Sequence, residues 1–271
     1  MKNKFLLSIV IPCFNSSKTI IRALDSVASS SNANIQIICV DDGSTDNTVE
    51  LIQNYSSSIP IKILSNSRSK GVAGALNTGI LESNSTYICR LDSDDAYEPG
   101  YIDNCIYFME CNPDVTIAAT SLNKIFLSQN NKILSSASQI YPNDHSFLLN
   151  SLSFMVIFGA NVIFRKSTIL FNESLWGEEE LDFAINNATC GKLGFVSNSS
   201  YSYFLTPSTG RSYKNRFKKK IVMVYLNFKA IYRFNLSFFC YFRSVSWLFY
   251  GLFPETFKRF LRPFLYKLLR N

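Results

Sequence analysis

The sequence lacks several patterns that mark common functional classes. It contains a single histidine, His145, so neither a histidine-based catalytic triad nor a histidine-rich zinc site can be built. The glycine-rich patterns GxGxxG and GxxxxGK[ST] are absent, which argues against dinucleotide-binding and P-loop proteins. The seven cysteines form no CxxC pair. Their odd number and their position in apolar runs predict buried thiols in a reducing compartment.

The chain also lacks a recognisable signal peptide and any run of about 20 charge-free apolar residues. Its 271 residues are 47% hydrophobic, which suits one large domain with an appendage. Charge is divided unevenly along it. Residues 1–205 hold 13 Lys/Arg and 19 Asp/Glu, whereas residues 206–271 hold 14 Lys/Arg and one acid, Glu255. We therefore predict a folded domain at 1–205 and a separate basic, aromatic-rich segment at 206–271.

Strand and helix patterns alternate through the first half of the chain. Continuous apolar runs that predict buried strands are found at 5–12, 35–40, 61–64, 87–91 and 115–120. Helical patterns are found at 19–28, 46–55, 71–81 and 101–111, with Asp46 as the expected N-cap of the second. This order predicts an α/β fold with a mostly parallel, Rossmann-like central sheet flanked by helices. Ligands of such sheets bind beyond the carboxyl ends of the strands.

Two acidic clusters directly follow predicted strands. The Asp41-Asp42 pair follows the second strand, and the segment Asp92-Ser93-Asp94-Asp95 follows the fourth. Carboxylate oxygens hold Mg²⁺ or Mn²⁺, which neutralise a nucleotide diphosphate. Alternate residues of an extended segment could direct one carboxylate to a ribose and the other to the metal. The plainer alternatives are an acidic surface loop for the second cluster and a turn for the first.

Four segments with characteristic motifs occur in order: SIVIPCFNSSKTIIRALDSV (8–27), VDDGSTDNT (40–48), GVAGALNTGI (71–80) and LDSDDAYEPGYI (91–102). Together they resemble the inverting GT-A glycosyltransferases of glycosyltransferase family 2, strongly over residues 5–120 and more loosely to 190. The resemblance implies a GT-A fold for 1–205, a Mn²⁺ or Mg²⁺ cofactor and a nucleotide-sugar donor, with a UDP-sugar favoured. It also implies a lipid-linked or glycan acceptor in the synthesis of a surface polysaccharide.

The resemblance implies roles for the matching residues. The nucleotide-binding residues are then Pro12, Phe14, Asn15, Asp41, Asp42, Arg68, Gly71, Asp92 and Ser93. Asp94 is implied as a metal ligand together with Asp92. Asp95 either faces the donor sugar or supports the loop.

A third acidic cluster, Glu178-Glu179-Glu180 with Asp182, precedes a predicted helix. An inverting transfer needs a carboxylate that removes the proton of the acceptor hydroxyl. By resemblance Glu180 occupies the position of this base, and a slip of one residue would make Glu179 the base instead. The plain alternative is that these acids only complement the dipole of a helix N-terminus.

The basic segment predicts amphipathic helices at 221–234, 238–253 and 257–269 that lie on an anionic membrane surface. Nucleic acid would also suit a basic, aromatic segment, but the many aliphatic residues favour lipid, and we expect no nucleic acid partner. The protein would then be peripheral on the cytoplasmic face of the cell membrane. Two rival interpretations are a sugar nucleotidyltransferase and a catalytically silent, membrane-bound module with a GT-A-like fold. Residues 12–20 lack the glycine-rich basic loop that the first rival needs.

Overall fold

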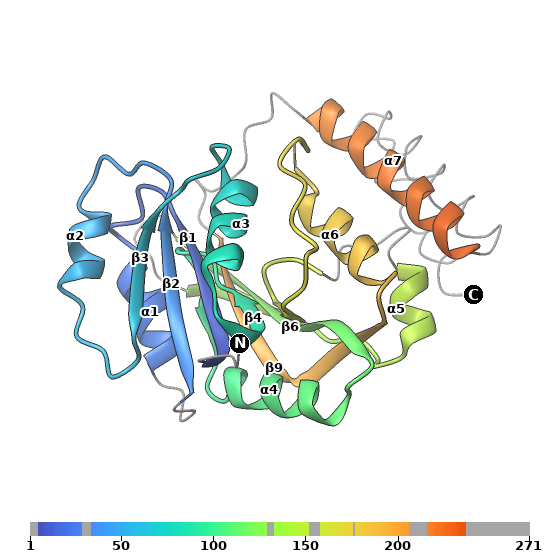
Figure 1. Cartoon of the computed structure of the whole chain (residues 1–271), viewed down its shortest axis with the longest axis horizontal. Coiled ribbons are helices and arrows are strands. Elements are labelled where there is room, and N and C mark those ends of the chain that lie inside the picture. Colours follow the sequence, from blue (N-terminus) through green and yellow to red (C-terminus); the bar gives the residue numbers. More distant parts are fainter. Residues whose placement is uncertain are drawn as a thin grey trace.

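A computed structural model describes residues 5–28, 34–128, 133–151, 158–175, 177–205 and 216–236. These residues form one nine-stranded sheet with helices packed on it (Figure 1). The strands are β1 (Phe5–Cys13), β2 (Ile35–Asp41), β3 (Ile61–Ser65), β4 (Ser85–Arg90), β5 (Ala96–Tyr97), β6 (Val115–Leu127), β7 (Ile133–Gln139), β8 (Val162–Arg165) and β9 (Lys192–Leu205). The helices are α1 (Ile20–Ala28), α2 (Thr48–Gln53), α3 (Val72–Glu82), α4 (Tyr101–Cys111), α5 (His145–Ser151), α6 (Glu179–Asn187) and α7 (Arg216–Phe234).

The N-terminal half of the sheet is parallel, as the strand and helix alternation predicts. Its strands lie in the order β3-β2-β1-β4, and each neighbouring pair is parallel. Strand β1 is covered on both faces: Leu7, Ile9 and Ile11 are fully buried on one face and Val10 on the other. This double burial explains its continuous apolar run. The carboxyl ends of β1, β2 and β4 consequently meet at one edge of the sheet.

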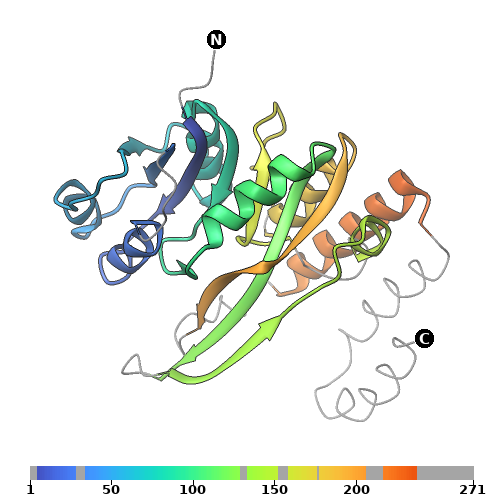
Figure 2. The ribbon, with the colours of Figure 1, turned by 90° about the horizontal axis from the view of Figure 1, so that it is seen from below.

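The second half of the sheet is mixed in direction. Strand β8 pairs antiparallel with both β4 and β6, while β6 and β9 are parallel. The hairpin partner β7 returns along β6, and Figure 2 shows these long strands running side by side. Strand β9 also pairs with the short β5, where Tyr97 lies opposite Tyr201. Through this pairing the end of β9 returns to the edge at which β4 ends.

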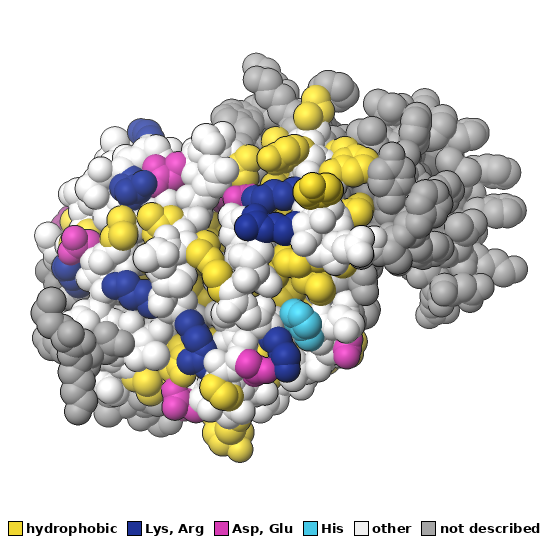
Figure 3. All heavy atoms as spheres, turned by 45° about the vertical axis from the view of Figure 1, so that its right-hand side comes forward, with side chains coloured by type: hydrophobic (Ala, Val, Ile, Leu, Met, Phe, Trp, Pro, Cys, Tyr) yellow, Lys and Arg dark blue, Asp and Glu magenta, His cyan; other side chains and the backbone are white. Residues whose placement is uncertain are grey.

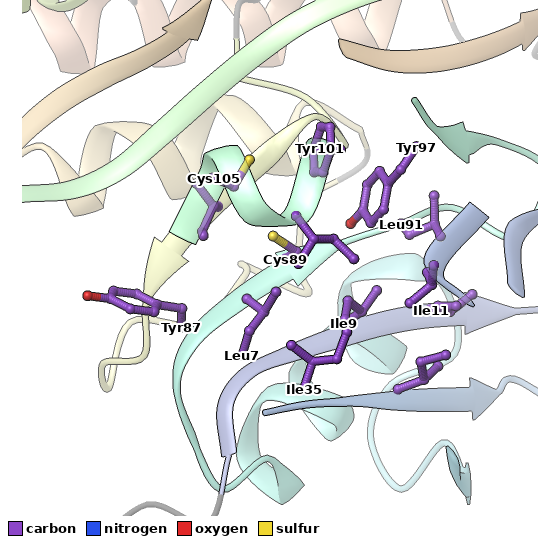
Figure 4. Close-up of a cluster of buried hydrophobic side chains, with 14 of the residues drawn as sticks. Leu7, Ile9, Ile11, Ile35, Tyr87, Cys89, Leu91, Tyr97, Tyr101 and Cys105 are labelled. Carbon is purple, nitrogen blue, oxygen red and sulfur yellow. The ribbon is translucent and has the colours of Figure 1, made fainter. Parts of the chain in front are cut away.

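Two apolar cores lie on opposite faces of the sheet. In the first, α1 and α4 cover β1 and β4, and Figure 4 shows Leu91 next to Tyr97, with Cys89 and Cys105 in the same cluster. The rings of Tyr97 and Tyr101 are stacked, with centroids 3.9 Å apart. In the second core, α3 and α6 pack on the other face. The central strands of the sheet are therefore covered on both faces.

Helix α7 packs beside α6 (Figure 1). Leu226 and Ala230 of α7 are fully buried in the second core, and Lys229 forms an ion pair with the buried Asp182 of α6. None of the helices in the described ranges is long and apolar enough to cross a bilayer. The predicted helices at 238–253 and 257–269 lie outside the described residues.

Two local predictions need correction. The N-cap position of α2 is Asn47 and not Asp46. The carboxylate of Asp46 instead accepts hydrogen bonds from the amides of Ser17 (3.1 Å) and Thr48 (3.0 Å), because it is shared between the loop after β1 and the start of α2. The prediction of buried thiols holds for four cysteines and is wrong for Cys111 and Cys190, which are exposed, while Cys240 lies outside the described residues. The four buried free cysteines are Cys13, Cys39, Cys89 and Cys105.

Candidate functional site

The loops that follow β1 and β2 are joined by hydrogen bonds. The amide of Asn15 donates to Oγ of Ser44 (3.0 Å), and Oδ1 of Asn15 accepts from the amide of Thr45 (2.8 Å). Asn15 has a positive φ of 50°, a left-handed conformation that asparagine tolerates better than most residues. Its neighbour Phe14 is half exposed, and Nζ of Lys70 lies 5.3 Å from the ring centroid of Phe14. An aromatic face is therefore available at the edge where Pro12, Phe14 and Asn15 are expected to meet a nucleotide.

Asp41 and Asp42 have different environments although they are adjacent. Asp41 closes its own turn by accepting from the amides of Gly43 (3.2 Å) and Ser44 (3.1 Å). Asp42 reaches across to the segment before α3, where it accepts from Nδ2 of Asn66 (2.6 Å) and the amide of Gly71 (2.8 Å). Gly71 has a φ of 119°, a backbone conformation that residues other than glycine rarely adopt. The sequence-predicted Asp42 and Gly71 thus lie together.

The segment that contains Arg68 is held from the other side by Glu173. This carboxylate pairs with Nε of Arg68 and accepts from Oγ of Ser69 (2.5 Å) and Nδ2 of Asn77 (2.7 Å). Burial opposes ionisation of Glu173, but these hydrogen bonds outweigh it and lower its pKa to about 2. Arg68 is therefore engaged by a partner that the sequence analysis did not identify.

The segment Asp92–Asp95 is a tight turn, whereas the sequence suggests an extended arrangement. The amide of Asp95 donates to the carbonyl of Asp92 (3.1 Å), which places the carboxylates of Asp92, Asp94 and Asp95 within 4.8 Å of one another. The hydroxyl of Ser93 is hydrogen-bonded to that of Ser16 (2.7 Å), so the turn is attached to the loop after β1. Since β1 lies between β2 and β4, Asp42 and Asp92 are two strand spacings apart, or about 10 Å along the same edge.

Asp95 is fully buried below this turn. Its carboxylate accepts from the hydroxyl of Tyr201 (2.7 Å) and the amide of Phe204 (3.0 Å), both on β9. Burial, followed by the negative charges of Asp92 and Asp94, raises the pKa of Asp95 to about 8. These contacts are those of a residue that supports the turn, one of the two roles expected for Asp95.

A buried arginine connects the turn to the third acidic cluster. Arg90, at the end of β4, donates through Nε and Nη2 to the two carboxylate oxygens of Asp92 (2.8 and 3.1 Å) and through Nη1 to Glu180 (2.9 Å). Burial disfavours its charge, but the carboxylates of Asp92 and Glu180 outweigh this and raise the pKa of Arg90. We call Arg90, Asp92 and Glu180 the Arg90 bridge. It joins residues of β4 and α6 at one place.

The two candidate bases differ in exposure. Glu179 is 7% exposed, whereas the side chain of Glu180 is 15% exposed and belongs to the Arg90 bridge. Glu178 precedes them with a positive φ of 66° and forms the N-cap position of α6. The arrangement thus brings Glu180 to the aspartate turn, and its role as a base stays a prediction.

The side chains at the turn fit a divalent cation. The three aspartates of the turn offer carboxylate oxygens, the ligands that Mg²⁺ and Mn²⁺ prefer. Burial and the negative charge of Asp92 raise the pKa of Asp94, and burial and the neighbouring carboxylates likewise raise the pKa of Asp95. A cation would offset this repulsion. Arg22 of α1 adds positive charge nearby: it donates to the carbonyl of Asp94, and its guanidinium lies 3.8 Å from the ring centroid of Phe204.

Several residues that contact the site were not predicted from the sequence. Arg90 carried a signal, because an arginine inside a buried strand requires acidic partners. Glu173 and Tyr201 carried none, since their contacts depend on how distant segments return to the edge of the sheet.

The parallel half-sheet, with carboxylates and an aromatic ring beyond the carboxyl ends of its strands, has the architecture of α/β proteins that bind ligands at this edge. The model of the family described as "Glycosyl transferase family 2" matches residues 8–170, and the chain belongs to this family. The membership does not favour the nucleotidyltransferase alternative.

Two relatives from Escherichia coli match part of the chain. The UDP-Glc:alpha-D-GlcNAc-diphosphoundecaprenol beta-1,3-glucosyltransferase WfaP of Escherichia coli is 40% identical over 105 residues, which cover 39% of this chain and 41% of WfaP. A chondroitin synthase of Escherichia coli is 34% identical over 106 residues, which cover 39% of this chain and 16% of the synthase. The chain therefore spans less than half of the length of either relative.

Solved structures share the fold. S. aureus TarS 1–349 in complex with UDP has a TM-score of 0.61 and 18% sequence identity, over 84% of this chain and 65% of TarS 1–349. The mannosyltransferase PcManGT from Pyrobaculum calidifontis, solved with GDP-Man and Mn²⁺, has a TM-score of 0.62 and 15% identity, over 85% of this chain and 65% of that protein. At these identities the likeness shows a common GT-A fold.

Proposed function

We propose that this protein is a metal-dependent, inverting glycosyltransferase that moves a sugar from a nucleotide-diphosphate sugar to a hydroxyl of a lipid-linked or glycan acceptor. The Arg90 bridge is the observation that carries the proposal. It sets a carboxylate suited to a base, Glu180, beside the carboxylates suited to a cation. A donor site and a proton acceptor side by side are what a single displacement requires.

The donor would lie along the edge formed by the carboxyl ends of β2, β1 and β4. Asp42 and the ring of Phe14 would contact the base and ribose, and Asp92 and Asp94 would hold the cation. A Mn²⁺ or Mg²⁺ ion held there would neutralise the leaving diphosphate. The UDP-bound TarS structure and the named donor of WfaP support UDP as the nucleotide.

Glu180 would accept the proton of the acceptor hydroxyl as its oxygen attacks the anomeric carbon. The bond between that carbon and the diphosphate then breaks on the opposite side, so one displacement inverts the configuration. Arg90 holds the carboxylate of Glu180 in place through the hydrogen bond from Nη1 (2.9 Å). Glu180 is therefore the residue on which we place the proton.

The acceptor would be lipid-linked, and α7 would hold the enzyme at the cytoplasmic face of a membrane. Helix α7 exposes Ile221 (51%), Tyr225 (62%) and Tyr232 (92%), and Figure 3 shows hydrophobic side chains gathered around Lys and Arg side chains on this side of the molecule. Apolar rings interleaved with basic residues suit an anionic lipid surface. WfaP, whose name gives an undecaprenol-linked acceptor, supports this acceptor class.

A donor panel tests the proposal. UDP- and GDP-sugars are incubated with the full chain, Mn²⁺ and a GlcNAc-diphospholipid acceptor, and the glycolipid product and its anomeric configuration are determined. We expect one donor to give product with an inverted anomeric centre. Failure of every nucleotide to raise the melting temperature in the presence of Mn²⁺ would reject the proposal and favour a silent module.

Membrane attachment has a separate test. Flotation with vesicles containing phosphatidylglycerol is compared for the wild type, Tyr225→Asp/Tyr232→Asp and Tyr107→Asp. Tyr107 is a matched control, because it is 71% exposed on α4. We expect only the α7 variant to float less. Equal flotation of all three would rule out this surface of α7 as the attachment site.

A further inference from the structure

We propose that Arg90 is a positioning residue that fixes the separation of Asp92 and Glu180 and thereby couples the cation side of the site to the acceptor side. The inference rests on the proposed function. It gives a role to a charge that lies fully inside the protein, at the end of β4. Neither Asp92 nor Glu180 alone explains why an arginine stands there.

The shape of the guanidinium supports this role. Nε and Nη2 lie on one edge of the planar group and grip both oxygens of Asp92, while Nη1 points to Glu180. A planar fork fixes the angle as well as the distance between its partners, whereas a lysine ammonium acts as a flexible point charge. The two carboxylates are therefore held by one rigid group, Asp92 by two hydrogen bonds and Glu180 by one.

The backbone of Arg90 is itself fixed. Val10 of β1 lies opposite Arg90 in the parallel ladder, and the carbonyl of Arg90 accepts a hydrogen bond from the hydroxyl of Tyr97 (2.8 Å). The side chain is 3% exposed, so little solvent weakens its ion pairs. A displacement of Asp92 would thus be transmitted to Glu180 through a group that has little freedom to adjust.

The charges of the Arg90 bridge also require this coupling. One positive charge serves two carboxylates, and Asp94 and Asp95 add negative charge beside them. When a cation binds Asp92, Arg90 would interact less strongly with Asp92 and more strongly with Glu180. Occupancy of the cation site would therefore reach the base through Arg90.

The test compares Arg90→Lys with Arg165→Lys, each in the wild-type and the Glu180→Gln background. Arg165 is a matched control on the neighbouring strand β8, where its side chain donates to the carbonyls of Val115 (2.9 Å), Met109 (2.8 Å) and Asn112 (3.1 Å). Two quantities are measured: the Mn²⁺ concentration that gives half of the UDP-induced rise in melting temperature, and kcat for glycosyl transfer.

We expect Arg90→Lys to raise this Mn²⁺ concentration about tenfold in both backgrounds, because Asp92 loses its bidentate partner. We expect kcat to fall about 10- to 100-fold in the wild-type background and less than about twofold in Glu180→Gln, since the effect on kcat passes through Glu180. Arg165→Lys should lower the melting temperature and leave the Mn²⁺ concentration unchanged.

Equal effects of Arg90→Lys and Arg165→Lys, or equal losses of kcat in the two backgrounds, would overturn the role of Arg90. If Arg90→Lys does not fold, a cycle of Asp92→Asn and Glu180→Gln tests the same coupling with Arg90 in place, and additive losses of kcat would refute it. A wild-type chain that neither responds to UDP and Mn²⁺ nor transfers a sugar would reject the proposed function instead.

Discussion

Replacement of Glu180 by glutamine separates chemistry from donor binding. Glutamine has nearly the same shape as glutamate. Its carbonyl oxygen can still accept the hydrogen bond that Nη1 of Arg90 donates to Glu180 (2.9 Å). Arg90 keeps Asp92 as a charged partner, so no buried charge is left uncompensated. The folded state and the aspartate turn should therefore survive, while the group that accepts the proton is lost.

Loss of a general base lowers rates by about 100- to 10,000-fold. We expect a fall of this size in kcat for Glu180→Gln, with the Kd for UDP in the presence of Mn²⁺ changed by less than about threefold. The assay is single-turnover transfer with a radiolabelled donor, which measures chemistry without product release. Titration calorimetry with UDP gives the Kd.

Glu179→Gln is the matched control. It removes the same chemical group one residue earlier, from a side chain that is more buried than that of Glu180. We expect it to retain most of the transfer rate. The reasoning would be refuted if Glu179→Gln lost transfer while Glu180→Gln kept more than a tenth of it, because the base would then be Glu179.

Three further outcomes are expected. Asp94→Asn should remove the Mn²⁺-dependent part of UDP binding, as EDTA should in the wild type, and calorimetry that shows undiminished Mn²⁺ dependence would exclude Asp94 as a ligand. Glu173→Gln should lower the free energy of unfolding by about 1 kcal/mol at pH 7. The pKa of Glu173 is depressed to about 2, so this difference in unfolding free energy should be constant above the ordinary pKa near 4.5 and shrink as the pH falls from there towards 2. Urea unfolding of both proteins at pH 7 and pH 3.5 measures it. An equal difference at the two pH values would contradict the argument. Asp182→Ala should cost about 2 kcal/mol, less than a fully buried pair because Lys229 is partly exposed, and unchanged urea unfolding would contradict this.

The sequence predicts the parallel half of the fold closely, because β1, β2 and β4 are buried on both faces and consist of continuous apolar runs. The helix at Tyr101–Cys111 is confirmed, and the bounds of strands β1 to β4 are confirmed to within two residues. The mixed second half is harder to predict, since the position of β8 between β4 and β6 follows from pairing between distant segments. No local pattern specifies such pairing.

The candidate site divides in the same way. The acidic clusters can be recognised in the sequence because they follow apolar strands, and the fold brings Asp42, Asp92 and Asp94 to one edge of the sheet. What local sequence does not reveal is the second layer of contacts. Glu173 and Tyr201 hold these residues from loops and strands far along the chain, so their partners depend on the tertiary fold.

The ion pair between α6 and α7 has a practical consequence for protein engineering. A fragment that stops at residue 205 would end where the acidic part of the sequence ends, yet it would strip Lys229 from Asp182 and uncover the apolar surface beneath Leu226 and Ala230. A carboxylate that is 3% exposed would then lack its counter-charge. Expression fragments should therefore extend at least through residue 236, even when only the donor chemistry is of interest.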